Sequence, residues 1–140
     1  MTNMPIQDLV VNVNLVSSAS LGKLAVLFPA DDIGGGPSVL TTALDVLDRG
    51  LLELVEAVPS GRSAVFASSR TSPARYLVLG THYCSCPAFI QAVRSASAAF
   101  CKHQLAAMLS SLGVGGAIAT RRVDDAHMAC ALLDGRTRLR

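Results

Sequence analysis

The amino-acid sequence predicts an α+β fold in which a small antiparallel sheet of about three strands packs against helices. Three short runs rich in β-branched and large apolar residues follow one another between residues 51 and 79, with turn residues between them. Stretches with apolar residues at helical spacing stand before and after these runs. At 140 residues, the chain fits one compact domain.

The N-terminal part begins with an apolar segment and a glycine-rich loop, residues 1–37. Residues 10–16 are compatible with a strand or with part of a helix, and periodicity does not decide between them. Three consecutive glycines at 34–36 and the proline after them break regular structure. Ser38 stands where a helix N-cap is expected, and apolar residues follow at helical spacing until Gly50.

The strands are expected at residues 51–58, 63–67 and 76–79. A Pro-Ser-Gly-Arg turn separates the first two, and a polar loop separates the second from the third. Such short connections favour an antiparallel meander. Together with the preceding helix, these strands form a predicted unit over residues 38–80.

The C-terminal part predicts a helical turn at 89–93, a helix over 101–112 that ends at Gly113, and a last helix over 123–133. Cys130 falls on the apolar side of the last helix and is expected in the core. We divide this part into a zinc-binding unit, 81–113, and a helix with a basic tail, 114–140, within one compact domain.

Composition excludes some classes of protein. The chain is 51% hydrophobic and 16% charged, and its net charge of +2 is far from the strongly basic balance of a dedicated nucleic-acid binder. A mean hydropathy of +0.45 fits two interpretations equally well: a protein that covers apolar surface with a partner, or a small domain rich in alanine, leucine and valine. No run reaches the roughly 18 apolar residues of a membrane helix, and a signal-peptide pattern is missing. We therefore expect an intracellular protein with reduced thiols.

The chemistry is concentrated between residues 81 and 103. Cys84-x-Cys86 is followed, after fourteen residues, by Cys101-x-His103. Zinc prefers four thiolate or imidazole ligands in a tetrahedron, and reduced cysteines in this pattern read as metal ligands before disulfides. Each pair alone is a weak signal, since free cysteines are often buried as small apolar residues, and a redox dithiol at the first pair is a minor alternative.

Cys101 and His103 can bind the same metal ion only if their side chains point toward one position, and this constrains the local structure. Two positions apart within a regular helix, side chains diverge by roughly 200 degrees. Cys101 must therefore lie at or just before a helix start, with His103 in the first turn. The first pair converges from extended backbone, where alternate side chains project to the same side, and Pro87 prevents a regular ladder beyond it.

The resulting site is closed, because four protein ligands leave no position for a reactive water. Three thiolates and Zn²⁺ sum to a charge of −1, which Lys102 and Arg94 are expected to offset. His82 is the one alternative ligand, but its position before the end of the strand favours a place next to the ligands or on the surface. No catalytic residues are assigned: we find no nucleophile–base pair, and the glycines at 34–36 lack the Gly-Lys-Ser/Thr ending of a phosphate loop.

These residues resemble a known family. The segments HYCSCPAF and FCKHQLA match the C-x-C and C-x-H signature of the SWIM zinc finger, and ALDVLDRG, VPSGR and YLVLGTHYCSCPAF extend the likeness upstream. The chain thus resembles the SWIM zinc-finger subunits of the Shu complex over residues 38–112. The resemblance implies one structural zinc ion, Zn²⁺, on Cys84, Cys86, Cys101 and His103.

The resemblance also implies a function. Members of this family are nuclear, non-catalytic factors of homologous recombination and DNA repair. They form a heterodimer with a RecA-like recombinase paralog and support recombinase filaments on single-stranded DNA. Lys102, Arg94 and His82 would then lie near the metal ligands or near DNA.

Two other functions remain open from the sequence. A direct DNA-binding SWIM module, as in transposase-like proteins, would use a basic face formed from Lys102, Arg94, Arg121, Arg122 and the arginine tail. A ubiquitin-ligase adaptor would need a docking helix that we do not identify in the sequence.

Overall fold

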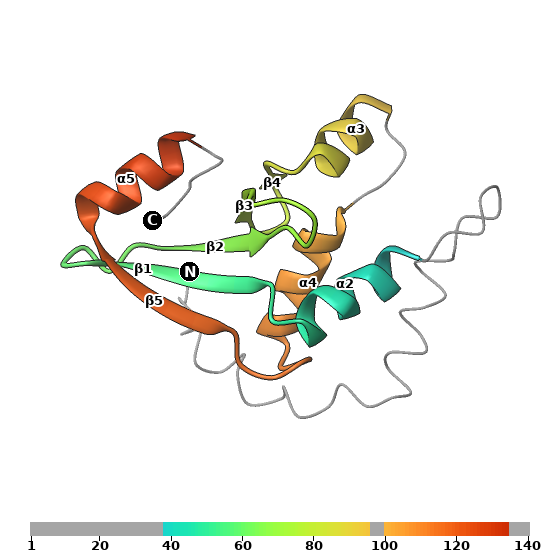
Figure 1. Ribbon diagram of the computed structural model, residues 1–140, viewed down its shortest axis with the longest axis horizontal. Coiled ribbons are helices and arrows are strands. Elements are labelled where there is room, and N and C mark those ends of the chain that lie inside the picture. Colours follow the sequence, from blue (N-terminus) through green and yellow to red (C-terminus); the bar gives the residue numbers. More distant parts are fainter. Residues whose placement is uncertain (1–37, 96–99, 135–140) are drawn as a thin grey trace, which may run out of the picture.

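The computed structural model describes residues 38–95 and 100–134 (Figure 1). The predicted N-terminal segment 1–37 and the arginine tail lie outside the described residues. In chain order the elements are α2 (Val39–Asp48), β1 (Leu52–Val58), β2 (Ser63–Ser68), β3 (Arg75–Leu79), β4 (Tyr83–Cys84), α3 (Pro87–Ser95), α4 (Lys102–Ser111), β5 (Ala119–Asp124) and α5 (Asp125–Asp134). The predicted α+β class is confirmed.

The sheet has five strands in the order β4-β3-β2-β1-β5. The three predicted strands are present as an antiparallel meander, each within about a residue of its expected bounds. Two short or exposed strands were not expected. β4 is two residues long, and β5 runs parallel to β1 at the other edge. The sheet is therefore mixed, with five strands instead of about three.

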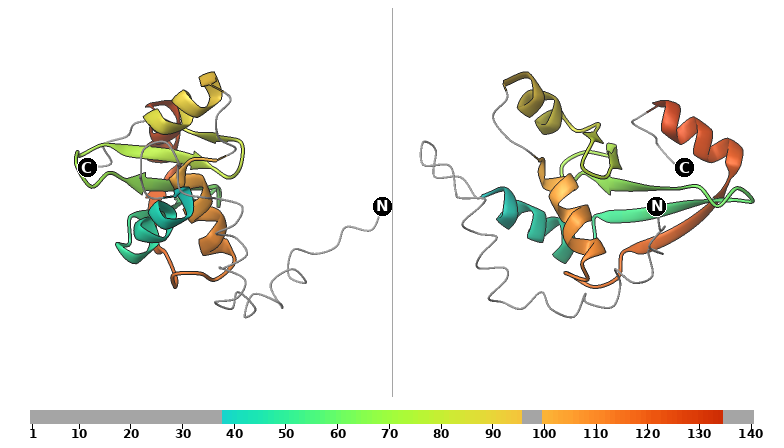
Figure 2. Two further views of the ribbon diagram at one scale, coloured as in Figure 1. Left: turned by 90° about the vertical axis from the view of Figure 1, so that its right-hand side faces the viewer. Right: turned by 180° about the vertical axis from the view of Figure 1, so that it is seen from behind.

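Helices cover both faces of this sheet (Figure 1, Figure 2). Alternate residues of β2 point to opposite faces, so that Ala67 packs with α2 and α4, whereas Ala64 and Phe66 pack with α5. Two buried clusters result. We call them the metal-side core, which includes the cysteines of the zinc motif, and the α5-side core, which is centred on Phe66.

Capping side chains fix where α2 and α5 begin. The hydroxyl of Ser38 accepts a hydrogen bond from the backbone N–H of Thr41 at 3.1 Å, which confirms the predicted N-cap. The last helix begins at Asp125 instead of residue 123, because Val123 in β5 pairs with Ala57 of β1 and the side chain of Asp124 accepts a bond from the N–H of His127 at 2.7 Å.

The expectation that Cys130 lies in the core is wrong: this cysteine is exposed. Met128 and Ala131 form the buried side of α5, three residues apart on one face. Cys130 lies two positions beyond Met128, which rotates it away from the sheet. None of the described helices is long and apolar enough to cross a membrane.

The turn after α4 packs closely against α2, which yields a prediction. Gly115 has φ +81°, and a Cβ added there would lie 2.9 Å from Cβ of Leu47. Gly115→Ala is expected to lower the free energy of unfolding by about 2–4 kcal/mol, because left-handed strain and overpacking add. The matched control is Gly116→Ala. At φ +80° with open space around it, that variant should lose only about 1–2 kcal/mol in denaturant unfolding. Equal losses would contradict the packing argument.

Candidate metal centre

Three elements place the predicted ligands at one corner of the metal-side core. Cys84 ends β4, which pairs with β3, and Cys86 stands directly before α3. Cys101 is the N-cap of α4, in extended backbone with φ −83° and ψ 168°, and His103 lies in the first turn of that helix. This confirms the prediction that the helix begins just after Cys101. Packing of α4 against β3 and β4 brings the two halves of the motif together.

The donor set fits a zinc ion. The four ligand atoms all lie within 4.8 Å of one another, and all four residues are buried. Sγ of Cys84 lies 3.8 Å from Nδ1 of His103. Zn–S and Zn–N bonds of about 2.3 and 2.0 Å imply a tetrahedral S–N edge of roughly 3.6 Å. A zinc ion thus needs only small movements of these side chains, with Nδ1 as the imidazole donor.

The N-termini of two helices face the sulfur atoms. The backbone N–H of Phe89 in α3 donates to Sγ of Cys86 at 3.3 Å, and that of Gln104 in α4 donates to Sγ of Cys101 at 3.4 Å. The side chain of Gln104 also accepts a bond from the N–H of Cys101 at 3.1 Å, which completes a capping box. These donors and the helix dipoles stabilise thiolate charge.

The sequence did not lead us to these backbone donors. We expected instead that the side chains of Lys102 and Arg94 would offset the −1 charge of the zinc site. A signal for them was present. Pro87 at the first position of a helix and the spacing Cys101-x-x-Gln104 both mark a cysteine that precedes a helix start. A sulfur in an N-cap position meets the free N–H groups of the first turn. Each of these two cysteines therefore both caps a helix and faces the metal position.

The three thiols perturb one another in the metal-free chain. Hydrogen bonds with Cys101 and then Cys86, together with burial, raise the pKa of Cys84. Hydrogen bonds with Cys101 and then Cys84 lower the pKa of Cys86. Zinc binding to the set must therefore release the proton of Cys84.

Proton release predicts how zinc affinity varies with pH. Because Cys84 keeps its proton in the metal-free state, the zinc dissociation constant should rise by about tenfold per pH unit for each proton released as the pH falls. Competition with a chromogenic chelator at pH 6.5 and 7.5 measures this dependence. Equal affinity at both pH values would show that the metal-free thiols are already ionised.

An aromatic contact orients the imidazole. The rings of Tyr76 on β3 and His103 lie 5.3 Å apart between centroids, tilted by 37°. His103 is only 4% exposed, so the ring is enclosed between the sheet and α4. This leaves Nδ1 directed at the sulfur atoms, as the contact with Cys84 requires.

The three other predicted residues are all exposed. Lys102 is the first residue of α4 and is exposed, Arg94 is exposed in the last turn of α3, and His82 is exposed in the turn before β4. Among the described residues, none of these side chains donates to a ligand sulfur. His82 is not part of the cluster of ligand atoms. A role for these residues near the metal or near DNA stays a prediction.

Comparison with known proteins agrees with this geometry. Residues 73–112 match the SWIM zinc finger family. The chain is 40% identical over 76 residues to zinc finger SWIM domain-containing protein 7 of Homo sapiens, which covers 54% of each protein. It is 43% identical over 72 residues to the protein of the same name from Mus musculus, which covers 50% of this chain and 46% of the relative.

The chain spans about half the length of the curated relatives it matches. No solved structure matches it. The resemblance seen in the sequence is confirmed by these comparisons, and the matched region includes all four buried Cys and His residues. The chain therefore contains a SWIM zinc finger able to bind one zinc ion, and over about half its length it is similar to zinc finger SWIM domain-containing protein 7.

Proposed function

We propose that this chain is a non-catalytic subunit of a Shu-type complex. It binds a RecA-like recombinase paralog, and the pair supports recombinase filaments on single-stranded DNA during homologous recombination and DNA repair in the nucleus. The similarity to zinc finger SWIM domain-containing protein 7 supports the family context. The closed set of four ligands supports a structural role for the metal.

The observation that carries the proposal is the exposed apolar surface of α3. This helix has no buried residue, although Ile90 and Val93, three positions apart on one face, are 39% and 64% exposed. Leu79 and Tyr83 on the adjoining strands are 43% and 40% exposed, and the ring of Tyr83 contacts Phe89 at 5.6 Å. We call Leu79, Tyr83, Ile90 and Val93 the α3 surface. Apolar side chains gathered in this way mark a protein-binding site.

The metal centre sets the position of this surface. α3 begins directly after Cys86 and contacts β4, while α2 and α4 pack against each other elsewhere (Figure 1). A zinc ion on Cys86 therefore anchors the start of the helix. This links zinc to partner binding without any catalytic step.

The experiment is affinity purification of the tagged chain followed by mass spectrometry. The wild type is expected to co-purify with a RecA-like paralog, and the double variant Ile90→Asp/Val93→Asp is expected to lose it while keeping one zinc ion. Leu133→Asp is the matched control, because Leu133 is 86% exposed on α5. Absence of every RecA-like protein from the wild-type sample would overturn the proposed function.

Direct DNA binding would use the exposed cations of the described residues. Arg122 pairs with Glu56 at 3.3 Å and Arg121 is half-buried, whereas Lys102 and Arg94 are exposed. Binding of a single-stranded oligonucleotide by the isolated chain, measured against salt, tests this point. A steep negative slope would favour the DNA-binding alternative.

A further inference from the structure

The last helix, α5, is apolar on nearly every side, yet little of it is buried. All but three of its ten residues, DAHMACALLD, are apolar, and only Met128 and Ala131 are buried. Leu132 and Leu133 near its end are 38% and 86% exposed. A helix that is apolar all round is normally covered on more than one side. The outward side of α5 therefore has the character of an interface.

The exposed apolar residues of this helix form one continuous face. Ala126, Ala129, Cys130 and Leu133 stand at positions i, i+3, i+4 and i+7, so they share one side of the helix. All four are exposed. We call these four residues the α5 outer face.

A groove borders the α5 outer face on the side of the turn that joins β1 to β2. Its volume is about 270 Å³, and its apolar lining comes from Ala57, Met128, Ala129 and Leu132. This volume lies below the range of roughly 300–1,000 Å³ that is usual for pockets of small-molecule ligands. The groove therefore suits an aliphatic side chain of another protein better than a free ligand.

The α5 outer face is complementary to itself in shape. Its side chains are small at the start and in the middle, and Leu133 is the large one at the end. In an antiparallel pair of α5 helices with a two-fold axis near Cys130, Leu133 of each copy lies over Ala126 of the other, beside the groove. A parallel pair would instead set the two Leu133 side chains against each other and leave the alanines uncovered.

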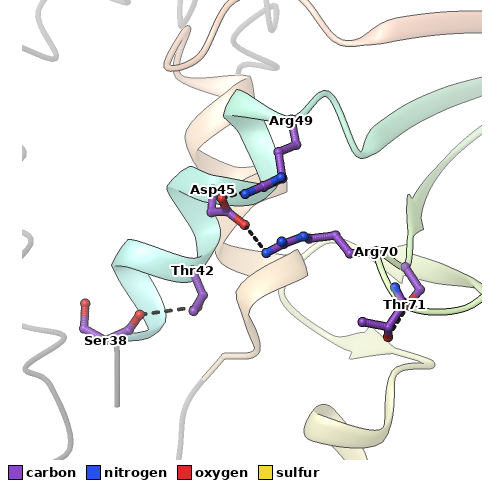
Figure 3. A network of polar contacts seen from close by, with 7 residues as sticks. Ser38, Thr42, Asp45, Arg49, Arg70 and Thr71 are labelled. Atoms are coloured by element: carbon purple, nitrogen blue, oxygen red, sulfur yellow. Dashed lines mark hydrogen bonds and ion pairs between the residues drawn. The ribbon is translucent and has the colours of Figure 1, made fainter. Parts of the chain in front are cut away.

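The carboxylates at the two ends of α5 lack the cations that an exposed carboxylate finds elsewhere in the chain. Asp45 on α2 binds two guanidinium groups, Arg49 at 2.7 Å and Arg70 at 3.3 Å (Figure 3). Asp125 at the start of α5 and Asp134 at its end form no ion pair with a described residue. Both ends of the helix therefore offer a charge to a partner.

The antiparallel pair fits these charges. Two residues after α5 the sequence continues with Arg136, and antiparallel pairing brings this position next to Asp125 of the other copy. Asp125 and Asp134 are nine positions apart, about 180° around the helix, so they lie on opposite flanks. Because like flanks of the two helices face each other in such a pair, Asp134 meets the flank of His127 and the carboxylates do not oppose one another.

We propose that the α5 outer face binds a second copy of this chain through an antiparallel, two-fold pair of α5 helices. The helices α3 and α5 lie apart on the molecule (Figure 1, Figure 2), so the dimer leaves the α3 surface free. The dimer does not depend on the proposed function, and it brings two α3 surfaces into one assembly. A contact between two short helices covers less than the roughly 800 Å² per partner of a stable interface, so we expect a Kd of about 10–100 μM.

Sedimentation velocity of the full zinc-loaded chain measures this assembly. The mass is expected to rise from the monomer value of 14.6 kDa toward twice that value as the concentration passes the expected Kd, from about 5 to about 300 μM. Leu133→Asp should remain monomeric with an unchanged circular dichroism spectrum, because Leu133 is exposed. Ile90→Asp/Val93→Asp is the control and should dimerise like the wild type. A monomeric wild type at the highest concentration would overturn the proposal.

A thiol cross-linker locates the contact. Cys130 lies near the proposed two-fold axis and is the one described cysteine outside the ligand cluster. Bismaleimidoethane, which forms a thioether with each of two thiols, should therefore join two wild-type chains and give no dimer with Cys130→Ser. Leu133→Asp should lower the yield about fivefold or more. An equal yield in this variant would show random encounter and contradict the dimer.

Exchange of two charges tests the antiparallel direction. Asp125→Arg and Arg136→Asp should each weaken the dimer about threefold, and the combined variant should restore it, because the pair is then re-formed with its signs reversed. Asp48→Arg makes the same change at an exposed position of α2 and should leave the dimer unchanged. Failure of the combined variant to recover affinity would overturn the antiparallel pairing.

A different protein on the same face is a further outcome of these experiments. Alkylation of Cys130 by N-ethylmaleimide should slow as the concentration of the isolated chain rises, because the dimer covers the thiol. If Cys130 reacts at the same rate at every concentration but is protected in the complex that co-purifies with the tagged chain, the face belongs to that partner. The second-copy proposal would then be wrong.

Discussion

Replacing Cys101 with alanine is expected to abolish stoichiometric zinc binding and to unfold the finger. The variant removes one of four ligands and the N-cap of α4 in one step. Structural zinc sites contribute about 10–16 kcal/mol near neutral pH, compared with about 5–15 kcal/mol for the net stability of a whole domain. Metal analysis should therefore give less than 0.2 zinc per chain, and circular dichroism should show loss of helix.

Two variants separate the metal contribution from general damage. Cys130→Ala changes the one described cysteine outside the cluster, which is exposed, and should keep one zinc ion and the wild-type melting temperature. Cys101→Ser keeps a side-chain oxygen to cap α4 but supplies a poorer zinc ligand. It should lose zinc nearly as completely as the alanine variant. A Cys101→Ala chain with one tightly bound zinc would show that the ligand set is wrong.

Phe66→Ala is expected to destabilise the α5-side core, which lies on the face of the sheet opposite the metal centre, without releasing the metal. Phe66 is fully buried in the α5-side core, against Met128 and Ala131. Truncation of a buried phenylalanine costs about 3–5 kcal/mol through lost burial and the cavity left behind. Denaturant unfolding of the zinc-loaded chain should reveal a loss of this size, with one zinc still bound under native conditions.

The control for this variant lies on a neighbouring strand. Val58 on β1 is 49% exposed, so Val58→Ala should change the free energy of unfolding by at most about 0.5 kcal/mol. Release of zinc by Phe66→Ala before unfolding would contradict the separation of the two cores. It would show that the sheet transmits the loss of packing from one face to the other.

The sequence was informative wherever one local rule determined the structure. Ser38 before an apolar helical stripe predicted the start of α2, because a side-chain oxygen there satisfies a free N–H. Convergence of Cys101 and His103 on one point required a helix start between them, and α4 begins there. The metal cluster was predictable for the same reason, since coordination geometry limits how the backbone can run.

The remaining features depend on contacts between distant segments. β5 pairs with β1 along one edge of that strand. Its sequence does not alternate between apolar and polar residues, and Arg122 in its middle is exposed, so there was no pattern from which to infer a strand. The orientation of Cys130 depends on which side of α5 meets the sheet, and that is settled by packing with β1 and β5. Backbone donors to the sulfurs have no side-chain signature, because every residue has an N–H group.

The parallel pairing of β5 with β1 has a consequence for biosynthesis. The four predicted metal ligands lie in the chain between the meander and the strand that completes the sheet. A ribosome releases β1 well before it releases residues 119–124, so one edge of β1 stays unpaired while the metal motif emerges. Zinc can therefore bind to a nascent chain whose sheet is still open. Residues 119–124 close that edge when they emerge, which protects it from pairing with other nascent chains.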